Sequence, residues 1–328
     1  MPEIPDLTVA FFYQDEWEAQ RFKDNVPPEV RVVALPRGSS PDEVDAASRD
    51  ADMIVGGGRV RELDVARTYP KLKLVQVLSA GTNYLPTAGL AEMGIRVANN
   101  YGGNAVAVAE VTIVLMVSAY RQLMVQWDQT NNKGTYMEGF EDNWERFHEL
   151  TGKRVGIVGL GHIGSRVARR LYGWECEVIY NDVRQFDAEY EAACNARRVS
   201  LDELVETSDV VTLHVPLDQT TEKMISDREF ELMKPGAVLI NACRGPVVDE
   251  AALIRALDAG QIAGAGLDVT EIEPIEANNP LLGRDNVVLL PHRAGTSIEA
   301  REKSIDTAVM NATLLSEGKD PVGVVLPV

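Results

Sequence analysis

Three polar residues, Arg244, Glu273 and His292, have the types needed for acid–base chemistry on a small organic acid. Each follows a different apolar run of the chain at a short distance. Because ligands of an open parallel sheet bind beyond the carboxyl ends of its strands, we expect the three side chains to meet at one sheet edge. There the arginine would clamp a carboxylate, the histidine would carry a hydroxyl proton, and the acid would orient and charge the histidine. The set favours hydride transfer between a nicotinamide and a 2-hydroxy acid, with no metal required.

The same residues also have purely structural interpretations. His292 could be a satisfied histidine before a helix, Arg244 could cap a carboxylate of the fold, and Glu273 could be a solvated loop acid. Among the four histidines of the chain, only His292 combines a strand end with a glycine-bearing loop, which ends at Gly295. We therefore favour the catalytic interpretation of His292 and of its two partners.

Two further residues follow the same apolar runs. Cys243 is interpreted as lining the site rather than as a nucleophile, because no histidine neighbours it in the sequence and nothing suggests a covalent intermediate. Asp268 either meets the nicotinamide side of the site or closes a turn.

The middle of the chain has the pattern of strand, glycine turn, helix and strand. Gly159 permits the tight turn, Gly161 lets the backbone approach a pyrophosphate, and Gly164 lets the helix pack closely on the strand. The helix, expected to begin near His162, would direct its N-terminal N–H groups at the phosphates. Asp182 ends the second strand, where a carboxylate accepts the ribose hydroxyls and repels a 2′-phosphate, so NAD is favoured over NADP. The alternative is an ordinary turn acid.

The composition is that of an acidic globular protein. The chain has 328 residues and a formal net charge of −18, which opposes binding to nucleic acid. Its three cysteines, Cys176, Cys194 and Cys243, form no paired motif and suit a reducing cytoplasm. The N-terminus lacks the basic segment of a signal peptide, and the most apolar run, 105–119, is too short to span a membrane. We expect a buried helix there and no membrane partner.

Two domains are expected, since 328 residues exceed the usual size of one core. A long helix is predicted from residue 104 to about 126. Continuous apolar runs are typical of strands buried in parallel sheets. They predict strands at 7–12, 30–35, 52–56, 72–78, 94–98, 155–158, 177–180, 210–215, 237–241, 263–268 and 287–290. The apolar tail after the last helix needs a core, which predicts that the chain returns to its first domain.

The predicted fold class is therefore α/β. A Rossmann-type doubly wound parallel sheet, the NAD-binding domain of residues 101–295, is inserted into a smaller discontinuous flavodoxin-like domain. The smaller domain consists of residues 1–100 and 296–328 and is expected to bind the substrate.

These motifs together resemble those of the D-isomer-specific 2-hydroxyacid dehydrogenases, a family that includes phosphoglycerate dehydrogenases and glyoxylate/hydroxypyruvate reductases. The resemblance covers nearly the whole chain. It rests on the segments 79–83, 107–110, 159–164, 208–216, 233–236, 240–250, 266–269, 273–274 and 291–292. It implies an NAD-dependent enzyme that acts on a D-2-hydroxy acid or its 2-keto partner, with Arg244, Glu273 and His292 as the catalytic residues.

The resemblance also implies binding residues and an oligomeric state. Backbone amides of Ala80 and Gly81 would hold the substrate carboxylate, together with Arg244 and His292. A homodimer is predicted because family members commonly pair through the nucleotide domain. Helix 105–119 is a candidate for the dimer surface; alternatively, it is buried in the core of its own chain. The NAD contacts would come from Gly159, Gly161, His162, Ile163, Gly164, Asp182, Ala242, Cys243, Arg244, Asp268, His292, Gly295 and, near the nicotinamide, Val108.

Several features leave alternatives open. Arg293 stands where the family usually has an apolar residue, and is either an extra anion contact or a surface residue. Cys243 stands where the family often has serine or alanine. Arg59 and Arg61 follow a triple glycine and either reach a phosphate or second carboxylate of the substrate or lie in a solvated loop. On the same scaffold the alternatives are a phosphite-type dehydrogenase and an NAD-sensing co-repressor-like binding protein. A formate dehydrogenase pairs its histidine with glutamine, so Glu273 argues against it.

Overall fold

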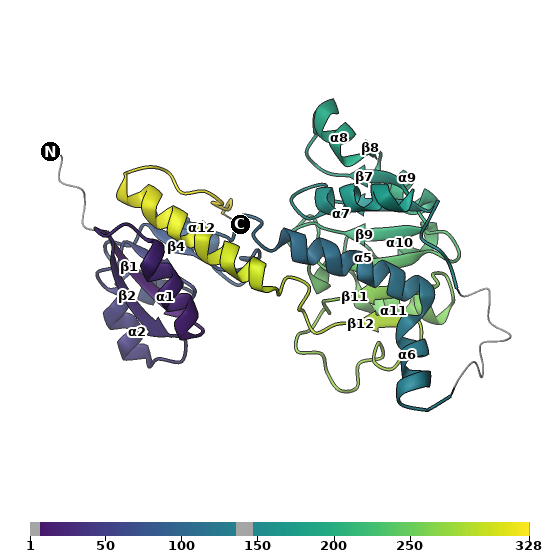
Figure 1. Ribbon diagram of the computed structural model, residues 1–328, viewed down its shortest axis with the longest axis horizontal. Coiled ribbons are helices and arrows are strands. Elements are labelled where there is room, and N and C mark those ends of the chain that lie inside the picture. The colour runs from purple at the N-terminus through teal and green to yellow at the C-terminus, as the bar shows by residue number, and fades with distance from the viewer. Residues whose placement is uncertain (1–6, 136–146, 328) are drawn as a thin grey trace. The chain divides into compact units, whose positions relative to one another are not determined.

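The computed structural model describes residues 7–135 and 147–327. The chain divides into two compact units, Met1–Asn104 with Thr296–Val328, and Ala105–Gly295 (Figure 1). Each unit has one parallel β-sheet with helices on both faces. This arrangement confirms the predicted α/β fold class.

The first unit is built on a five-stranded sheet in the order β2-β1-β3-β4-β5. The strand order reverses direction at β1, so the switch point, where ligands of open sheets bind, lies between β1 and β3. The strands pair in parallel and comprise β1 (Thr8–Tyr13), β2 (Arg31–Pro36), β3 (Met53–Val55), β4 (Leu74–Gln76) and β5 (Arg96–Ala98).

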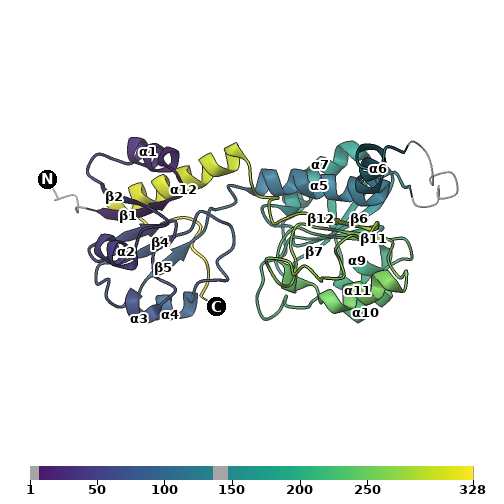
Figure 2. The ribbon, with the colours of Figure 1, turned by 90° about the horizontal axis from the view of Figure 1, so that it is seen from below.

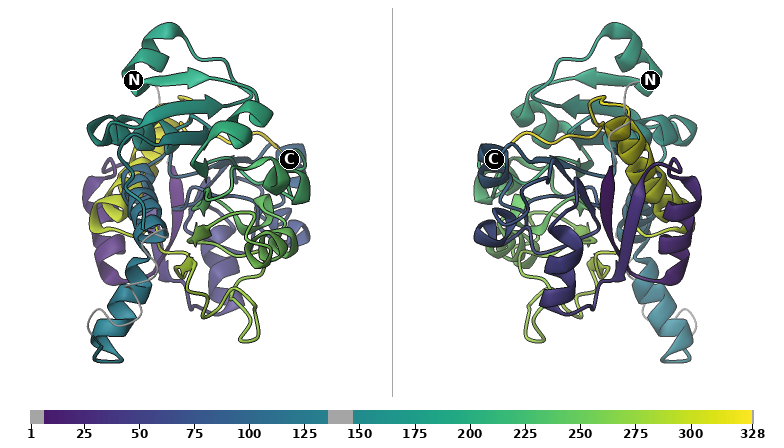
Figure 3. Two further views of the ribbon diagram at one scale, coloured as in Figure 1. Left: turned by 90° about the vertical axis from the view of Figure 1, so that its right-hand side faces the viewer. Right: turned by 90° about the vertical axis from the view of Figure 1, so that its left-hand side faces the viewer.

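Helices cover both faces of this sheet (Figure 2). The helices are α1 (Glu16–Asn25) and α12 (Ile298–Ser316) on one face, and α2 (Pro41–Ser48), α3 (Leu63–Ala66) and α4 (Thr87–Glu92) on the other. Although α1 and α12 lie far apart in the sequence, they pack side by side, and Arg21 and Asp306 form an ion pair of 2.8 Å between them (Figure 3). Helix α2 begins at a capping box in which Ser40 and Glu43 each accept a hydrogen bond from the other's backbone N–H.

The C-terminal tail returns to the core of the first unit, as the sequence predicted. Val324 forms an isolated antiparallel bridge with Ala98. The N–H of Val325 donates to the carbonyl of Val97 at 2.9 Å, and the Val325 side chain packs against the apolar cluster beneath α2 and α4.

The second unit has a seven-stranded parallel sheet in the order β12-β11-β10-β9-β6-β7-β8. Its switch point lies between β6 and β9, the first and fourth strands of the unit in chain order. The strands are β6 (Arg154–Val158), β7 (Glu177–Asn181), β8 (Ala196–Arg198), β9 (Val210–Leu213), β10 (Val238–Asn241), β11 (Gly264–Leu267) and β12 (Val287–Leu289).

Two apolar clusters bury the faces of this second sheet (Figure 2). One cluster lies under α5 (Ala105–Arg121), α7 (Gly164–Leu171) and α8 (Ala188–Cys194). The other lies under α9 (Leu201–Thr207), α10 (Asp227–Leu232) and α11 (Glu250–Asp258). Because helices cover both faces of the sheet, its strands are continuous apolar runs. This is why most of them could be predicted from the sequence.

The structure corrects three local predictions. The long helix breaks at Gln122, whose φ of 46° ends α5 and starts α6 (Leu123–Asn131) in a new direction. Helix α7 begins at Gly164 rather than near His162. The short edge strand β8 was not predicted, because its sequence, Ala196–Arg198, is largely polar and carries no apolar signal.

Among the helices of the described ranges, none is by itself long and apolar enough to cross a membrane. Only α5 and α6 taken together, across a bend of 72°, reach the required length and composition. Most of α5 is buried against β10, β11 and α7 of its own unit, as predicted for a buried helix.

Candidate active site

The glycine turn connects β6 to α7 at the switch point of the second sheet. Gly159 has a φ of +93°, and a Cβ there would lie 2.7 Å from the carbonyl oxygen of His214. A Cβ on Gly164 would lie 2.0 Å from the carbonyl oxygen of Gly159, so only glycine lets the helix approach the strand. Beside Gly161 there is open space. Within the described ranges, no protein group accepts from the N–H of Gly161 or Ile163, so both can face an anion.

Asp182 ties the end of β7 to the glycine turn. Its Oδ2 accepts from the N–H of Leu160 at 2.8 Å, and its Oδ1 accepts from the N–H of Arg184 at 2.8 Å. Its backbone carbonyl accepts from the guanidinium of Arg198 at 2.8 Å. Each carboxylate oxygen has a second lone pair, so a half-buried Asp182 can still accept from ribose hydroxyls.

His292 and Glu273 form the central pair of the site. The Nδ1 atom of His292 lies 2.7 Å from Oε2 of Glu273, and the other carboxylate oxygen accepts from the N–H of Thr270 at 3.3 Å. Both side chains are more than one third exposed. The backbone of His292 has a φ of 54°, which is uncommon for a residue with a side chain and recurs at functional sites.

Asp268 builds the turn that carries His292. Its carboxylate accepts from the N–H groups of Arg293 and Ala294, both at 2.8 Å, and its carbonyl accepts from the N–H of His292 at 2.8 Å. Burial raises the pKa of Asp268, against the opposing effect of these two N–H groups. Of the two roles considered for this residue, the structure shows turn closure.

Arg244 and Cys243 follow β10 in a loop held by Asn241. The side chain of Asn241 accepts from the N–H of Cys243 at 3.0 Å and donates to the carbonyl of Arg244 at 2.9 Å. The guanidinium Nη1 of Arg244 donates to the carbonyl of Cys243 at 2.6 Å. A Cβ on the next residue, Gly245, would lie 1.8 Å from the carbonyl oxygen of Thr270, so this loop packs against the loop that carries Glu273.

Two of the other histidines, His162 and His214, have different surroundings. Burial lowers the pKa of His214 to about 3, and its Nδ1 is buried with no partner in the described part of the chain. Burial, helped by Arg166 and Arg184, also lowers the pKa of His162. Neither imidazole is therefore charged near neutral pH. The sequence had not singled out His214; its position after β9, across the switch point from the glycine turn, was the available signal.

The thiol of Cys243 is protonated at neutral pH. Burial raises its pKa to about 11, and Sγ donates to Oδ1 of Asn241 at 3.1 Å. A thiol in this state is a poor nucleophile, in agreement with the lining role.

Three further residues of the predicted site are Val108, Ala80 and Gly81. Val108 is 4% exposed and lies in the same apolar cluster as Ala242 and Ala294, which follow β10 and β12. Ala80 and Gly81 lie in the first unit, in the loop after β4. Within the described ranges, no group accepts a hydrogen bond from either of their two N–H groups.

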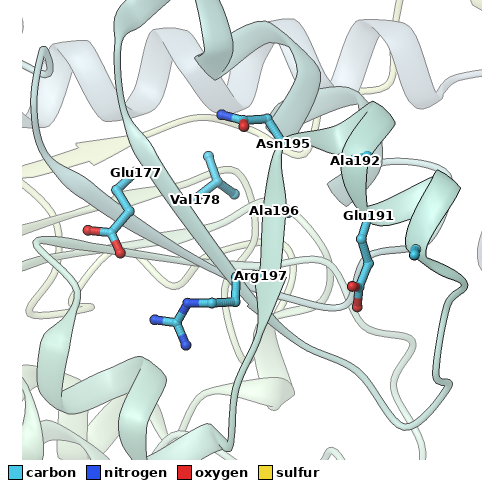
Figure 4. A pocket seen from close by; sticks show the side chains of 8 residues that line it. Glu177, Val178, Glu191, Ala192, Asn195, Ala196 and Arg197 are labelled. Atoms are coloured by element: carbon cyan, nitrogen blue, oxygen red, sulfur yellow. The ribbon is translucent and has the colours of Figure 1, made fainter.

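A shallow cavity of about 420 Å³ opens at the amino ends of β7 and β8 (Figure 4). The three charged side chains that line it already have partners: Glu177 pairs with Arg154, Glu191 with Tyr180, and Arg197 with Glu203. It lies at the opposite end of the strands from the glycine turn, so it is not the dinucleotide site. Among the described residues there is also no group of His, Cys, Asp or Glu arranged to hold a metal ion.

The family model "D-isomer specific 2-hydroxyacid dehydrogenase, NAD binding domain" matches residues 113–294. A glyoxylate reductase from Thermofilum pendens is 38% identical over 265 residues, 80% of this chain and 78% of that protein. A glyoxylate reductase from Korarchaeum cryptofilum is 33% identical over 324 residues, 98% of this chain and 93% of that protein.

Solved structures agree with the sequence relatives. The apo form of Rhodotorula graminis D-mandelate dehydrogenase has a TM-score of 0.85, is 28% identical, and is matched over 99% of both chains. An acyclic imino acid reductase in complex with NADPH and D-Arg has a TM-score of 0.82 and is 27% identical, over 98% of this chain and all of that one. The suggested resemblance is thus confirmed: the chain belongs to the D-isomer-specific 2-hydroxyacid dehydrogenase family and is an NAD-dependent enzyme of that family.

Proposed function

We propose that the enzyme interconverts a small 2-keto acid of the glyoxylate class and its 2-hydroxy acid, of D configuration where the product is chiral. The names of the sequence relatives support the substrate class. The observation that carries the proposal is the 2.7 Å pair of His292 and Glu273 at the carboxyl edge of the second sheet. A carboxylate-held imidazole at this edge is suited to moving the proton that accompanies a hydride.

The proposed proton path begins at Glu273. An ionised carboxylate only accepts hydrogen bonds, so Nδ1 of His292 carries the hydrogen of the pair. This fixes Nε2 as the nitrogen that exchanges a proton with the substrate oxygen. No group of the described chain bonds to Nε2. In reduction Nε2 donates to the carbonyl oxygen, and in oxidation it accepts the hydroxyl proton; the charge of Glu273 stabilises the imidazolium between these steps.

Arg244 and backbone amides are proposed to bind the carboxylate of the substrate. A guanidinium offers a planar fork of donors that matches a carboxylate, and Arg244 follows β10, adjacent in the sheet to the strand whose loop carries Glu273. The N–H groups of Ala80 and Gly81 supply further donors for the same carboxylate. The positive charge of Arg244 also polarises the keto group for reduction.

The cofactor residues fit a dinucleotide. The open space at Gly161 and the N–H groups of the turn suit a pyrophosphate, and Asp182 suits a ribose. Ala242, Cys243, Asp268, Gly295 and the other residues implied by the resemblance complete the proposed binding surface. When bound, the nicotinamide supplies or accepts the hydride.

Steady-state oxidation of NADH with glyoxylate, hydroxypyruvate and pyruvate tests the proposal. We expect turnover with at least one of these acids and D configuration in the chiral products. Turnover with phosphite and NAD alone would instead identify a phosphite dehydrogenase, and NADH binding without any turnover would identify a binding protein. Either result would refute the proposal.

We also propose a homodimer, formed through the second unit. Helix α6 has no buried residue, and it extends away from its sheet in Figure 1. Met124 and Trp127 of α6 are 49% and 53% exposed, and Val114 of α5 adds to the apolar surface. The buried part of α5 is intrachain core, so α6 and not α5 supplies most of this surface. Light scattering should give a mass of about twice the chain mass of 35.9 kDa. Trp127→Glu should lower this measured mass. A wild-type protein with the mass of a monomer would contradict the proposal.

A reducing location, the cytoplasm, is proposed as well. All three cysteines are buried free thiols, which suits a compartment where disulfides do not form. Fractionation of the native cells, followed by immunodetection of the chain, would check it.

A further inference from the structure

The glycine turn is anchored to α8 as well as to the end of β7. The carbonyl of Leu160 accepts a hydrogen bond from the hydroxyl of Tyr190, in α8, at 3.2 Å. Among the described residues, this hydroxyl is the only donor to that carbonyl. The N–H of Leu160 donates to Asp182 at 2.8 Å, so both backbone groups of this buried residue have partners.

The hydroxyl of Tyr190 sets the direction of the next backbone N–H. In a trans peptide the carbonyl and the N–H point in opposite directions. Because the carbonyl of Leu160 points at α8, the N–H of Gly161 points away from α8. Within the described ranges no protein group accepts from this N–H, and there is open space beside Gly161. The N–H is therefore a donor that an anionic ligand can use.

Gly161 does not hold this orientation by itself. Glycine has no Cβ and populates more backbone conformations than any other residue. A rotation of the peptide between Leu160 and Gly161 would present the carbonyl oxygen to a ligand in place of the N–H, and the negative end of the peptide dipole repels an anion. A contact on the carbonyl of Leu160 is what prevents this rotation.

Several neighbours fix the position of Tyr190. Its ring stacks on that of Phe186, with centroids 4.6 Å apart and an angle of 14° between the planes. The guanidinium carbon of Arg169, in α7, lies 5.8 Å from the centre of the ring, within the range of a cation–π contact. The N–H of Tyr190 donates to Asp187, the N-cap of α8, at 2.7 Å. The ring is thus held independently of the hydroxyl, and loss of the hydroxyl alone leaves this packing in place.

We infer that Tyr190 is a positioning residue for the cofactor and keeps the N–H of Gly161 directed at the pyrophosphate. The inference rests on the proposed function, because it takes the pyrophosphate to lie at the glycine turn. The hydroxyl acts through the Leu160 peptide and is distant from the reacting carbon. It therefore strengthens the binding of dinucleotides, and it acts on KM for NADH and not on kcat. One hydrogen bond of this kind changes affinity by about threefold to tenfold.

Tyr190→Phe tests the inference, because it removes the hydroxyl and keeps the ring on Phe186. Its dissociation constants for NADH and for ADP-ribose, which has the pyrophosphate but no nicotinamide, should rise by about threefold to tenfold. The dissociation constant of adenosine, which has no phosphate, should stay within about twofold of the wild-type value when measured by competition with NADH. The kcat at saturating NADH should also stay within about twofold. Tyr172→Phe is the matched control, since the side chain of Tyr172 is 70% exposed.

The outcomes separate positioning from general support of the fold. A rise that is specific to NADH and ADP-ribose supports the inference. If Tyr190→Phe binds ADP-ribose as Tyr172→Phe does, the inference is overturned. If adenosine loses as much affinity as ADP-ribose, the hydroxyl supports the whole nucleotide site and the inference is overturned as well.

The same measurements distinguish a failure of the inference from a failure of the proposed function. ADP-ribose should bind to the wild type at least about tenfold more tightly than adenosine, because the glycine turn binds its pyrophosphate. If the two bind equally well, both the inference and the proposed place of the cofactor fail. The binding of ADP-ribose requires no keto acid, so wild-type protein that reduces no keto acid would refute the proposed reaction, and the effect of Tyr190→Phe on ADP-ribose would still decide the inference.

Discussion

The carboxylate of Glu273 lies 2.7 Å from Nδ1 of His292, on the side of the ring opposite Nε2. Glu273→Gln keeps a hydrogen-bond acceptor at this position but removes the charge that stabilises an imidazolium. We expect kcat/KM for keto-acid reduction to fall about 100-fold. The affinity for NADH, measured by fluorescence titration, should change less than twofold. Glu276→Gln, a change of an exposed acid in the same loop, is the control; equal kinetics in the two variants would show that the pair does not serve catalysis.

Arg244→Lys keeps the positive charge but loses the planar fork of donors. We expect kcat/KM for the keto acid to fall between about 10-fold and 100-fold, while the dissociation constant of NADH stays within about threefold. Steady-state kinetics at saturating NADH would measure kcat/KM for the keto acid, and fluorescence titration with NADH would measure the dissociation constant. If kcat/KM in this variant equals that of the wild type, a residue other than Arg244 binds the substrate carboxylate.

We propose a double role for Asp182: its oxygens hold the glycine turn, and its charge would face the ribose of the cofactor. Asp182→Asn removes the charge and keeps one acceptor for the N–H of Leu160. We predict that the kcat/KM of the wild type is far higher with NAD than with NADP. In the variant, the ratio of kcat/KM with NAD to kcat/KM with NADP should fall at least tenfold. Glu189→Gln, an exposed acid of α8, serves as control. A wild type that prefers NADP would disprove the assignment.

The buried thiol of Cys243 gives a pH-dependent prediction. An unfolded chain loses the thiol proton near pH 9, whereas the folded chain keeps it to about pH 11. The folded state therefore binds more protons in this window, and the free energy of unfolding falls as pH rises from about 9 to 11, by up to roughly 1.4 kcal/mol per pH unit. Cys243→Ser, which keeps a donor to Asn241, should flatten this slope in urea denaturation. Parallel slopes would refute the predicted shift.

Most of the fold could be predicted from the sequence because both sheets are covered on two faces. Strands of this kind are continuous apolar runs, and eleven of them were found within two residues of their observed ends. The polar edge strand β8 has no such signal. The break at Gln122 was missed because the helix-forming sequence continues through it, and the change of direction comes from a single residue with positive φ.

The site was predictable in its residue types but not in its geometry. Strand ends and glycine spacing indicated Arg244, Glu273 and His292 as one group. The sequence left open whether Asp268 would meet the nicotinamide side or close a turn, and no pattern indicated that Asp182 would bond to Leu160. These contacts depend on where loops distant in the sequence meet, which only the folded chain determines. The ion pairs of Arg59 with Asp45 and Glu62, at 2.8 Å and 2.7 Å, and the contact of Arg61 with the Tyr84 ring have the same origin.

The central claim is that His292 exchanges the substrate proton. His292→Asn tests it most directly, because asparagine tolerates the left-handed backbone found at this position, where φ is 54°, and cannot act as a general acid or base. Its kcat/KM for glyoxylate and hydroxypyruvate should be measured against that of the wild type, with the affinity for NADH determined in parallel. We predict a loss of about 100-fold to 10,000-fold in kcat/KM with NADH affinity within about twofold. Turnover within tenfold of the wild type would contradict the account.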